Sequence, residues 1–252
     1  MVGTRLTLGA MTEILPPLPE DQIHRVLVVV AHPDDVEYGT SAAVARWVRR
    51  GIHVSYLLLT AGEAGMQIPP EEVGPLRARE QRAACDAVGV DDLVILNHPD
   101  GMLNDHLALR KDIARRIREV RPDAVVAGTW EVEVGWGLNQ ADHRVAGLAT
   151  LDAVRDADNT WVFRDLATEE NLPKWATRWL LVSGATPSHV VPVDQRDVDA
   201  AVASLECHGE YLAAIPGHPA PATFIPEMLQ QQGTAGGVSH GVAFKAYQLI
   251  RD

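Results

Sequence analysis

The chain has 252 residues, of which 46% are apolar, and this is enough material for one buried core. Its 22 basic and 34 acidic residues give a formal net charge of −12 at pH 7. So negative a chain is a poor candidate for binding nucleic acid or an anionic membrane surface by bulk electrostatics. The apolar content also argues against intrinsic disorder.

Residues 1–22 are predicted to form an irregular tail without a signal peptide, and residues 23–252 to form a single domain. No segment reaches the ~20 apolar residues that a membrane span needs. Cys85 and Cys207 are too few for a disulfide framework. We therefore expect a cytoplasmic protein that neither inserts into a membrane nor binds nucleic acid.

From residue 26 onward, apolar β-branched runs alternate with helical patterns. The first run lacks polar residues, as expected of a parallel strand that is buried on both faces. Glycines stand where the first two helices should end. In chain order the predicted elements are a strand at 26–31, a helix at 41–50, a strand at 53–60, a helix at 75–88, a strand at 93–96, a helix at 107–120, a strand at 124–128 and a helix at 142–154.

This alternation predicts an α/β fold with a Rossmann-like, mostly parallel sheet and helices on both faces. Beyond about residue 155 the pattern becomes less regular. Strands are predicted at 179–183 and 190–193 and a helix at 197–213, and the stretch 216–241, rich in Pro, Gly and Gln, is predicted to be a loop. The C-terminal part is expected to be a less regular continuation of the same domain.

The motif Ala31-His32-Pro33-Asp34-Asp35 follows the first predicted strand, at the edge where open parallel sheets bind their ligands. A dinucleotide-binding fold would have glycines at this turn, so the motif argues against that function. His32 and Asp35 lie three residues apart across a turn stiffened by proline. An imidazole nitrogen and a carboxylate oxygen could therefore converge on one cation at ~2.0–2.2 Å.

Asp34, between these two residues, would point elsewhere and could act as a base on a water that the metal activates. A single aspartate here could simply cap the next helix. A histidine and two adjacent acids at this edge of the sheet exceed what capping requires. The motif therefore favours a metal site.

A zinc site needs a third ligand, which must come from another loop. His143 begins a predicted helix after the long loop that leaves the strand at 124–128, at the same edge of the sheet as His32. By position it is a better candidate than His98, which lies in the loop after the third predicted strand. Asp142 could orient a ligand or a catalytic group, or cap the helix.

These motifs resemble those of the LmbE-like or PIG-L-type zinc de-N-acetylases. That family includes deacetylases of N-acetylglucosaminyl inositols and amidases of the mycothiol pathway. The resemblance covers about residues 24–155 and rests on AHPDD and a later (H)xDH motif. Shorter matches support it at 60–65 (TAGEAG), 77–80 (RxxE), 100–101 (DG) and 121–123 (RPD).

The resemblance implies a Rossmann-like hydrolase with Zn²⁺ bound by three ligands, His32, Asp35 and His143. Fe²⁺ or Co²⁺ would accept the same ligands. It further implies that Asp34 is the general base and that Asp142 orients a catalytic group. The resemblance implies that Arg77 and Glu63 lie at the substrate, and Asp100 is expected there too. Trp136 is expected to line the substrate pocket because of its position beside the loop before His143.

Gln140 stands three residues before His143, where the family has a histidine that is thought to stabilise the oxyanion and assist the leaving amine. A glutamine can donate a hydrogen bond to an oxyanion, but it cannot deliver a proton at pH 7. Three alternatives remain open: Asp34 transfers the proton alone, a C-terminal histidine (His208 or His218) enters the site, or activity is weak.

We therefore predict a zinc-dependent hydrolase that removes the acetyl group from a small N-acetylated substrate, a sugar of the N-acetylglucosamine type. One alternative is an amidase that acts on a thiol conjugate or a natural product. Another is a catalytically weakened metal- or sugar-binding protein, as Gln140 would permit. The family resemblance also makes a homo-oligomer plausible.

Overall fold

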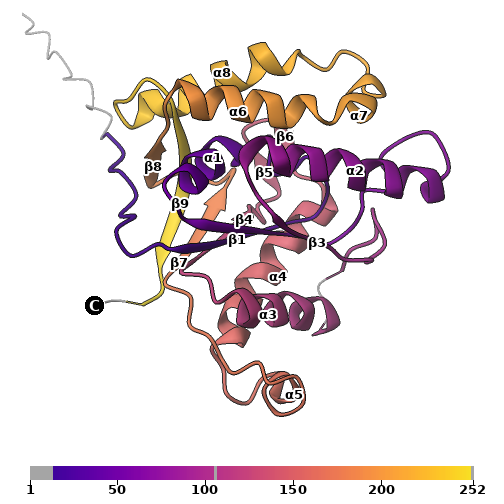
Figure 1. The fold of residues 1–252 in the computed structure, drawn as a ribbon, viewed down its shortest axis with the longest axis vertical. Helices are drawn as coiled ribbons and strands as arrows, with labels where there is room; N and C mark the ends of the chain where they lie inside the picture. Colours follow the sequence, from indigo (N-terminus) through magenta and orange to yellow (C-terminus); the bar gives the residue numbers. More distant parts are fainter. Residues whose placement is uncertain (1–13, 105–106, 251–252) are drawn as a thin grey trace, which may run out of the picture.

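The computed structural model describes residues 14–104 and 107–250 (Figure 1). Its centre is a seven-stranded sheet with the strand order β3-β2-β1-β4-β7-β9-β8. The first five strands in this order are parallel, and β9 is antiparallel to both of its neighbours. The strands are β1 (Arg25–Val30), β2 (His53–Leu58), β3 (Asp92–Ile95), β4 (Ala124–Gly128), β7 (Trp179–Ser183), β8 (His189–Pro192) and β9 (Gly241–Gln248), and a separate hairpin joins β5 (Glu133–Val134) to β6 (Gly137–Leu138).

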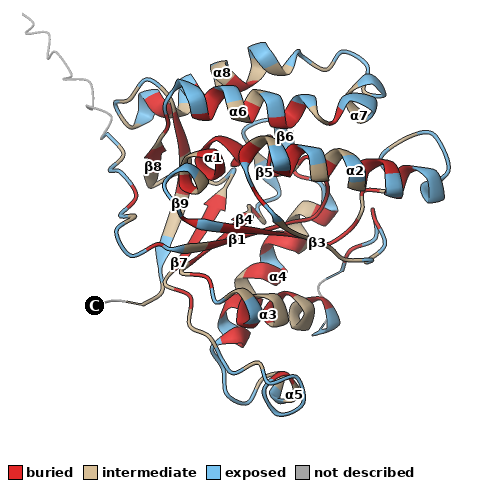
Figure 2. Ribbon diagram, in the orientation of Figure 1, coloured by how far each residue is buried: buried red, intermediate tan, exposed pale blue. Residues whose placement is uncertain are grey.

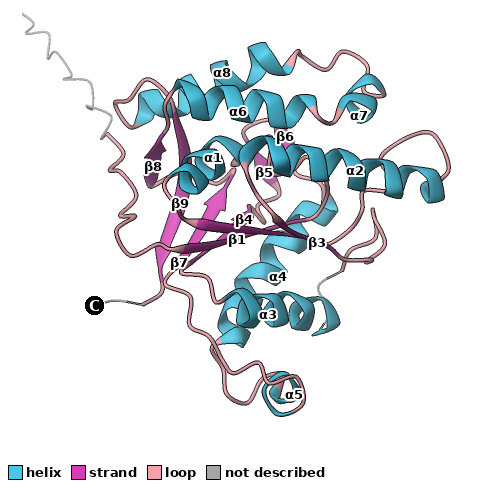
Figure 3. Ribbon diagram, viewed as in Figure 1, coloured by secondary structure: helices cyan, strands magenta, loops and turns pink. Residues whose placement is uncertain are grey.

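Helices cover both faces of the sheet (Figure 3). One face carries α1 (Ser41–Arg49), α2 (Pro70–Val88), α6 (Gln195–Glu206) and α8 (Pro221–Ala235), with the short α7 (Gly209–Ala213) after α6. The other face carries α3 (Leu107–Val120) and α4 (Ala141–Ala157), and α5 (Arg164–Thr168) follows them. The prediction of a mostly parallel sheet between two helical layers is confirmed.

The inner strand β1 is covered on both faces, which explains why polar and apolar residues do not alternate in its sequence. Val26, Val28 and Val30 belong to the core on the α1 side. Leu27 and Val29 belong to the core on the α3 and α4 side. Figure 2 shows the same burial along the neighbouring strands. Because helices cover both faces, the five successive side chains from Val26 to Val30 are all buried, and all of them are apolar.

The largest difference from the predicted elements lies in the C-terminal part. The stretch 216–241 contains α8, so the prediction of a loop there is wrong. Pro221 stands at the start of this helix, where a missing N–H costs nothing, and Ile225 and Leu229, one turn apart, are buried. Gly233 gives the stretch a loop-like composition, but it permits close packing, because a Cβ there would lie 2.8 Å from the backbone that leads into β9.

Three smaller differences separate the structure from the predicted elements. β9, which inserts antiparallel between β7 and β8, was not predicted. The single helix predicted at 197–213 is two helices, α6 and α7, with a break at His208. α2 begins at Pro70 rather than Pro75, because Pro70 occupies the first helical position and the helix accommodates Pro75 within it.

The described end of the N-terminal tail packs against the C-terminal part of the chain. Pro17 forms a bridge with Val190, and Leu18 is buried. Residues 1–13 of the predicted tail lie outside the described residues. Among the helices of the described ranges, none has the length and apolar composition that crossing a membrane requires.

Candidate metal centre

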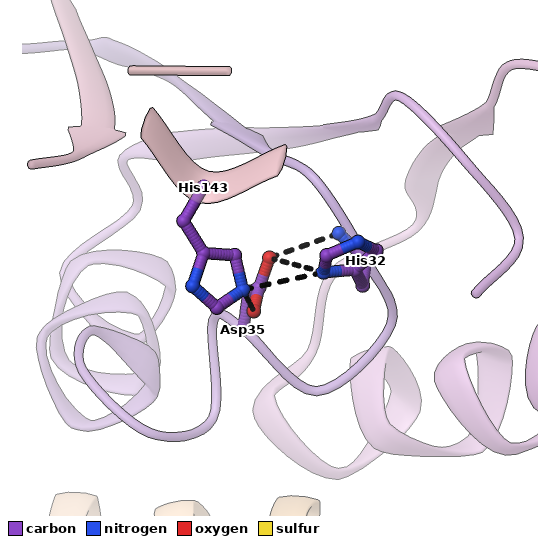
Figure 4. A group of neighbouring side chains, drawn as sticks. All are labelled: His32, Asp35 and His143. Carbon is purple, nitrogen blue, oxygen red and sulfur yellow. Dashed lines mark hydrogen bonds and ion pairs between the residues drawn. The ribbon is translucent and has the colours of Figure 1, made fainter. Parts of the chain in front are cut away.

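Two neighbouring parallel strands lead into the site. β1 pairs with β4, yet the chain leaves β1 toward α1 on one face of the sheet and leaves β4 toward α4 on the other. Such a change of direction opens a crevice at the carboxyl ends of the strands. His32 and Asp35 follow β1, and His143 lies in the first turn of α4. The fold therefore brings the three side chains together, as Figure 4 shows.

The three side chains present their donor atoms within a small space. His143 Nε2 lies 3.0 Å from Asp35 Oδ1 and 3.2 Å from His32 Nδ1. His32 Nδ1 lies 3.6 Å from Asp35 Oδ2. Ligands at ~2.0–2.1 Å from one tetrahedral zinc ion are about 3.3 Å apart, so these separations fit a single divalent ion. Two imidazoles and a carboxylate are also a donor set of catalytic zinc sites, which keep the fourth position open.

Two further carboxylates hold His32 from its other side. Its Nε2 lies 2.9 Å from Asp100 Oδ1 and 3.4 Å from Asp142 Oδ2. Nε2 therefore donates its hydrogen toward these acids, and Nδ1, which faces Asp35 and His143, is the nitrogen that would bind a metal ion after losing its proton. Burial lowers the pKa of His32, but the hydrogen bonds to the aspartates outweigh burial and raise that pKa to about 12. The surroundings of this imidazole strongly stabilise positive charge.

Asp35 has the opposite electrostatic environment. Burial raises the pKa of its carboxyl group, but hydrogen bonds from His143 and His32 outweigh burial and hold that pKa well below its usual range. Asp35 Oδ2 also accepts the backbone N–H of His32 at 2.9 Å, which closes the turn of the AHPDD motif. Asp35 is therefore ionised near neutral pH, as a metal ligand must be.

Replacing Asp100 with asparagine should weaken metal binding by ~10–100-fold, the usual cost of losing a carboxylate behind a histidine ligand. The amide keeps the shape of the side chain but removes the charge that holds the Nε2–H of His32. Competition with a chelating dye measures the dissociation constant for Zn²⁺. Asp112→Asn is a matched control. Asp112 also pairs with a histidine, His98, at 3.1 Å, but it belongs to neither group of potential metal ligands among the described residues. Equal weakening by both substitutions would contradict the orienting role of Asp100.

Asp34 differs from the metal-ligand candidates in its backbone and in its partners. Its φ of 81° is left-handed, and its carboxylate Oδ1 lies 3.2 Å from Arg77 Nη2 of α2. Burial raises the pKa of Asp34, the charge of Arg77 opposes this, and the resulting pKa is about 7. A carboxyl group with such a pKa can accept and release protons near neutral pH, as a general base must.

Arg77 was predicted to contact the substrate, and in the structure its contacts are with the loops around Asp34. The side chain is buried, and it donates to the carbonyl oxygens of Gly62 at 3.0 Å and Pro33 at 2.6 Å. The ring of Tyr211, from α7, lies 3.8 Å from its guanidinium carbon. Arg77 therefore ties the AHPDD turn to the loop after β2.

The acidic residues predicted around the substrate connect the loops of the site. Glu63 accepts the backbone N–H of Asp100 at 2.9 Å, and Asp100 accepts that of Ala64 at 2.7 Å. Asp142 is buried and accepts the backbone N–H of Gly101 at 2.7 Å. Asp142 was predicted to orient a catalytic group or a ligand, and in the structure it contacts His32, a candidate metal ligand. These carboxylates hold the loops after β2 and β3 against the start of α4.

Gln140 and Trp136 are the two predicted site residues that lie at the surface. Gln140 is the exposed N-cap residue of α4, three residues before His143. Trp136 stands in the β5–β6 hairpin and is 70% exposed. Its indole packs against Gly184, where a Cβ atom would lie 2.8 Å from the ring. Both side chains are accessible to a molecule approaching from solvent.

Three other histidines considered from the sequence have partners outside the candidate centre. His98 pairs with an aspartate of α3 at 3.1 Å. His208 is completely buried and lies 3.5 Å from Glu37, so it is enclosed in the protein rather than open to a substrate. Nε2 of His218 lies 2.6 Å from the hydroxyl of Tyr38.

Two neighbours of Asp34, Gln81 and Tyr211, were not predicted from the sequence. Gln81 accepts the backbone N–H of Asp34 at 3.0 Å. Its position one turn after Arg77 on the same helix could have indicated it, since such residues share a helix face. Tyr211 belongs to the less regular C-terminal part, and no local pattern connected it to the motif.

Comparison with known proteins places the chain in a family. The family model described as PIG-L: GlcNAc-PI de-N-acetylase matches residues 27–154, a range that includes all the predicted site residues. A 1D-myo-inositol 2-acetamido-2-deoxy-alpha-D-glucopyranoside deacetylase of Kineococcus radiotolerans is 30% identical over 86% of this chain and 80% of its own length. A diacetylchitobiose deacetylase of Thermococcus kodakarensis is 31% identical over 54% of this chain and 51% of its own.

The fold is also similar to a solved one. The N,N'-diacetylchitobiose deacetylase from Pyrococcus horikoshii, in complex with its inhibitor MPG, has a TM-score of 0.80 at 20% identity. The match covers 91% of this chain and 86% of that chain, and at this identity it shows a common fold. Other curated relatives are matched over about half of their length, for example 55% and 43%.

Proposed function

Because the chain belongs to the PIG-L family of GlcNAc-PI de-N-acetylases, we propose that it is a metal-dependent hydrolase that removes the acetyl group from an N-acetylated amino sugar. The observation that carries this proposal is the position of Asp34. Asp34 has a pKa of about 7, and the next residue in the sequence, Asp35, is one of the three side chains that fit a divalent ion. Hydrolysis of an amide by water needs this combination of a base and an electrophilic centre.

The metal that we propose is zinc, held by His32, Asp35 and His143. Two imidazoles and a carboxylate suit Zn²⁺, although Fe²⁺ or Co²⁺ would accept the same ligands. When bound, the ion supplies the Lewis acidity that activates a water and polarises the acetamide carbonyl. The side chain of His143 is the most exposed of the three, at 33%, so the substrate approaches from its side.

The protein's own residues move the proton. Asp34 accepts a proton from the attacking water as the new bond forms between the water oxygen and the acetyl carbonyl carbon. When the C–N bond breaks, Asp34 returns this proton to the amine nitrogen. The immediate products are acetic acid and the free amine, which become acetate and an ammonium when the proton of the acid passes to the amine, and Asp34 is again a carboxylate. Gln140 has the role of a neutral hydrogen-bond donor to the oxyanion, because it is exposed one helical turn before His143.

The substrate that we propose is a small molecule containing N-acetylglucosamine. The names of the relatives from Kineococcus and Thermococcus support this, since both name deacetylases of acetamido sugars. The exposed indole of Trp136 offers an apolar face against which a sugar ring can pack. Cys85 and Cys207 are free thiols, which supports the cytoplasm as the proposed location.

A single assay tests the proposal. The purified protein, loaded with Zn²⁺, is incubated with N-acetylglucosamine, N,N'-diacetylchitobiose and an N-acetylglucosaminyl inositol, and the released amine is measured with an amine-reactive dye. We expect release from at least one sugar, loss of release after treatment with a strong chelator, and recovery when Zn²⁺ is restored. Binding of zinc without release from any N-acetyl sugar would overturn the proposal and favour a binding protein.

A further inference from the structure

A set of buried polar side chains lies behind the turn that carries Asp34. Gln81 of α2 accepts the backbone N–H of Asp34 with its Oε1 at 3.0 Å. The amide nitrogen of the same side chain lies 3.4 Å from Oε1 of Glu37. Gln81 is 0% exposed and Glu37 is 1% exposed. The amide of Gln81 thus connects the turn of the base to a carboxylate inside the protein.

Glu37 is held in turn by the C-terminal part of the chain. Its Oε1 lies 3.0 Å from the hydroxyl of Ser204 in α6, and its Oε2 lies 3.5 Å from Nε2 of His208. Both partners are completely buried. Buried charges persist in proteins when they are paired and hydrogen-bonded, so Glu37 has a defined position between α6 and the AHPDD turn.

This pairing determines which way the amide of Gln81 faces. A carboxylate accepts hydrogen bonds and does not donate them, so Gln81 must present its NH₂ group to Glu37. Its carbonyl oxygen then faces the N–H of Asp34. In the reversed orientation the carbonyl oxygen of Gln81 would face the carboxylate of Glu37, and its NH₂ group would face the N–H of Asp34. Both arrangements would leave buried polar groups without a hydrogen bond.

The left-handed backbone of Asp34 makes this acceptor important. A non-glycine residue at φ 81° is in a sparsely populated conformation, which persists only where its surroundings hold it. Gln81 holds the backbone N–H, and Arg77, one turn earlier on α2, holds the carboxylate at 3.2 Å. Two residues on adjacent turns of α2 therefore hold the backbone and the side chain of Asp34.

We propose that Gln81 is a positioning residue that holds Asp34 in its catalytic conformation, and that Glu37 fixes the orientation of the Gln81 amide. Among the described residues, the hydrogen bonds of the Gln81 side chain go to the backbone N–H of Asp34, to Glu37 and to Cys85, so Gln81 acts through the backbone of the base. The effect on turnover rests on the proposed function, whereas the effect on the Asp34 backbone does not.

The first test replaces Gln81 with methionine, which has a similar length but cannot accept the Asp34 N–H. We expect the Asp34 amide to lose its protection against hydrogen exchange, measured residue by residue by NMR. Zinc content should be unchanged, kcat should fall by ~10²-fold, and KM should change little, as when a catalytic group is misplaced by about 1 Å.

Gln232→Met is the control, because the side chain of Gln232 also accepts a backbone N–H, that of Ala243 in β9, at 2.7 Å. It lies on α8, so we expect a comparable loss of thermal stability with normal kcat and normal exchange at Asp34. The inference is overturned if Gln81→Met leaves Asp34 protected, or if it lowers zinc content as strongly as turnover, because Gln81 would then support the whole turn rather than the base.

A second test exchanges the two groups that face each other. Gln81→Glu alone places two carboxylates 3.4 Å apart, so we expect loss of turnover and of protection at Asp34. Adding Glu37→Gln restores a donor facing an acceptor, and the double variant should recover at least ~10-fold of the lost turnover together with the protection. Absence of recovery would contradict the role given to Glu37.

The two proposals fail in different ways. If the natural protein hydrolyses no N-acetyl sugar, the proposed function fails, but hydrogen exchange at Asp34 still decides whether Gln81 positions it. If the natural protein is active and the exchange at Asp34 is the same in Gln81→Met, only the positioning role fails.

Discussion

An Asp34→Asn variant is expected to bind zinc like the natural protein and to hydrolyse its substrate ~10²–10⁴-fold more slowly. Asparagine has the shape of aspartate, keeps the backbone N–H that Gln81 accepts, and still offers Arg77 an oxygen. It cannot take a proton from water near neutral pH. The loss should therefore appear in kcat, because the substitution removes the base and leaves the three candidate ligands in place.

The measurement combines kcat on the best substrate with zinc content determined by elemental analysis. Asp86→Asn is a matched control, since Asp86 also pairs with an arginine of α2, Arg82, at 3.0 Å but is exposed and lies outside the site. It should change neither quantity. A rate close to that of the natural protein in Asp34→Asn would show that another group is the base.

A His143→Ala variant should lose its zinc and its activity together. The natural protein is expected to hold about one zinc ion per chain with three protein ligands. Removing one leaves His32 and Asp35, which lie on one turn of the chain. Changes behind a ligand cost 10–100-fold in affinity, so the loss of a ligand itself should exceed ~10²-fold.

Zinc content after dialysis against a weak chelator provides the readout. His98→Ala serves as the control, because His98 was the other loop histidine considered as third ligand and in the structure it pairs with Asp112. We expect this control to retain its zinc. If His143→Ala kept all of its zinc and His98→Ala lost it, the third ligand would be His98 rather than His143.

The sequence alone was enough to predict the parallel sheet and the candidate metal centre. Strand β1 could be recognised because burial on both faces requires an uninterrupted apolar run. His32 and Asp35 lie within one turn, so their convergence is a local property. His143 could be added because parallel strands end at one edge of the sheet, and its helix follows a neighbouring strand of that sheet.

The C-terminal elements were harder to predict because their local composition conflicts with their structure. α8 has prolines, glutamines and a glycine that are typical of loops, and it is helical because Ile225 and Leu229 pack in the core. β9 is a strand because it lies between β7 and β8, both of which are distant in sequence. In both cases tertiary packing outweighs intrinsic propensity.

The contacts around the candidate catalytic groups were decided by the tertiary structure. That Asp100 and Arg77 contact the substrate stays a prediction, and the structure adds the contacts of Asp100 with His32 and of Arg77 with Asp34. The sequence contains these residue types, but a hydrogen bond depends on the direction of each side chain to within a fraction of an ångström. Those directions are set by how α2, α4 and α6 pack around the sheet. Local patterns were therefore sufficient to predict the fold class and the candidate donors, whereas the contacts that hold the candidate base and candidate ligands depend on the packing of elements that are distant in sequence.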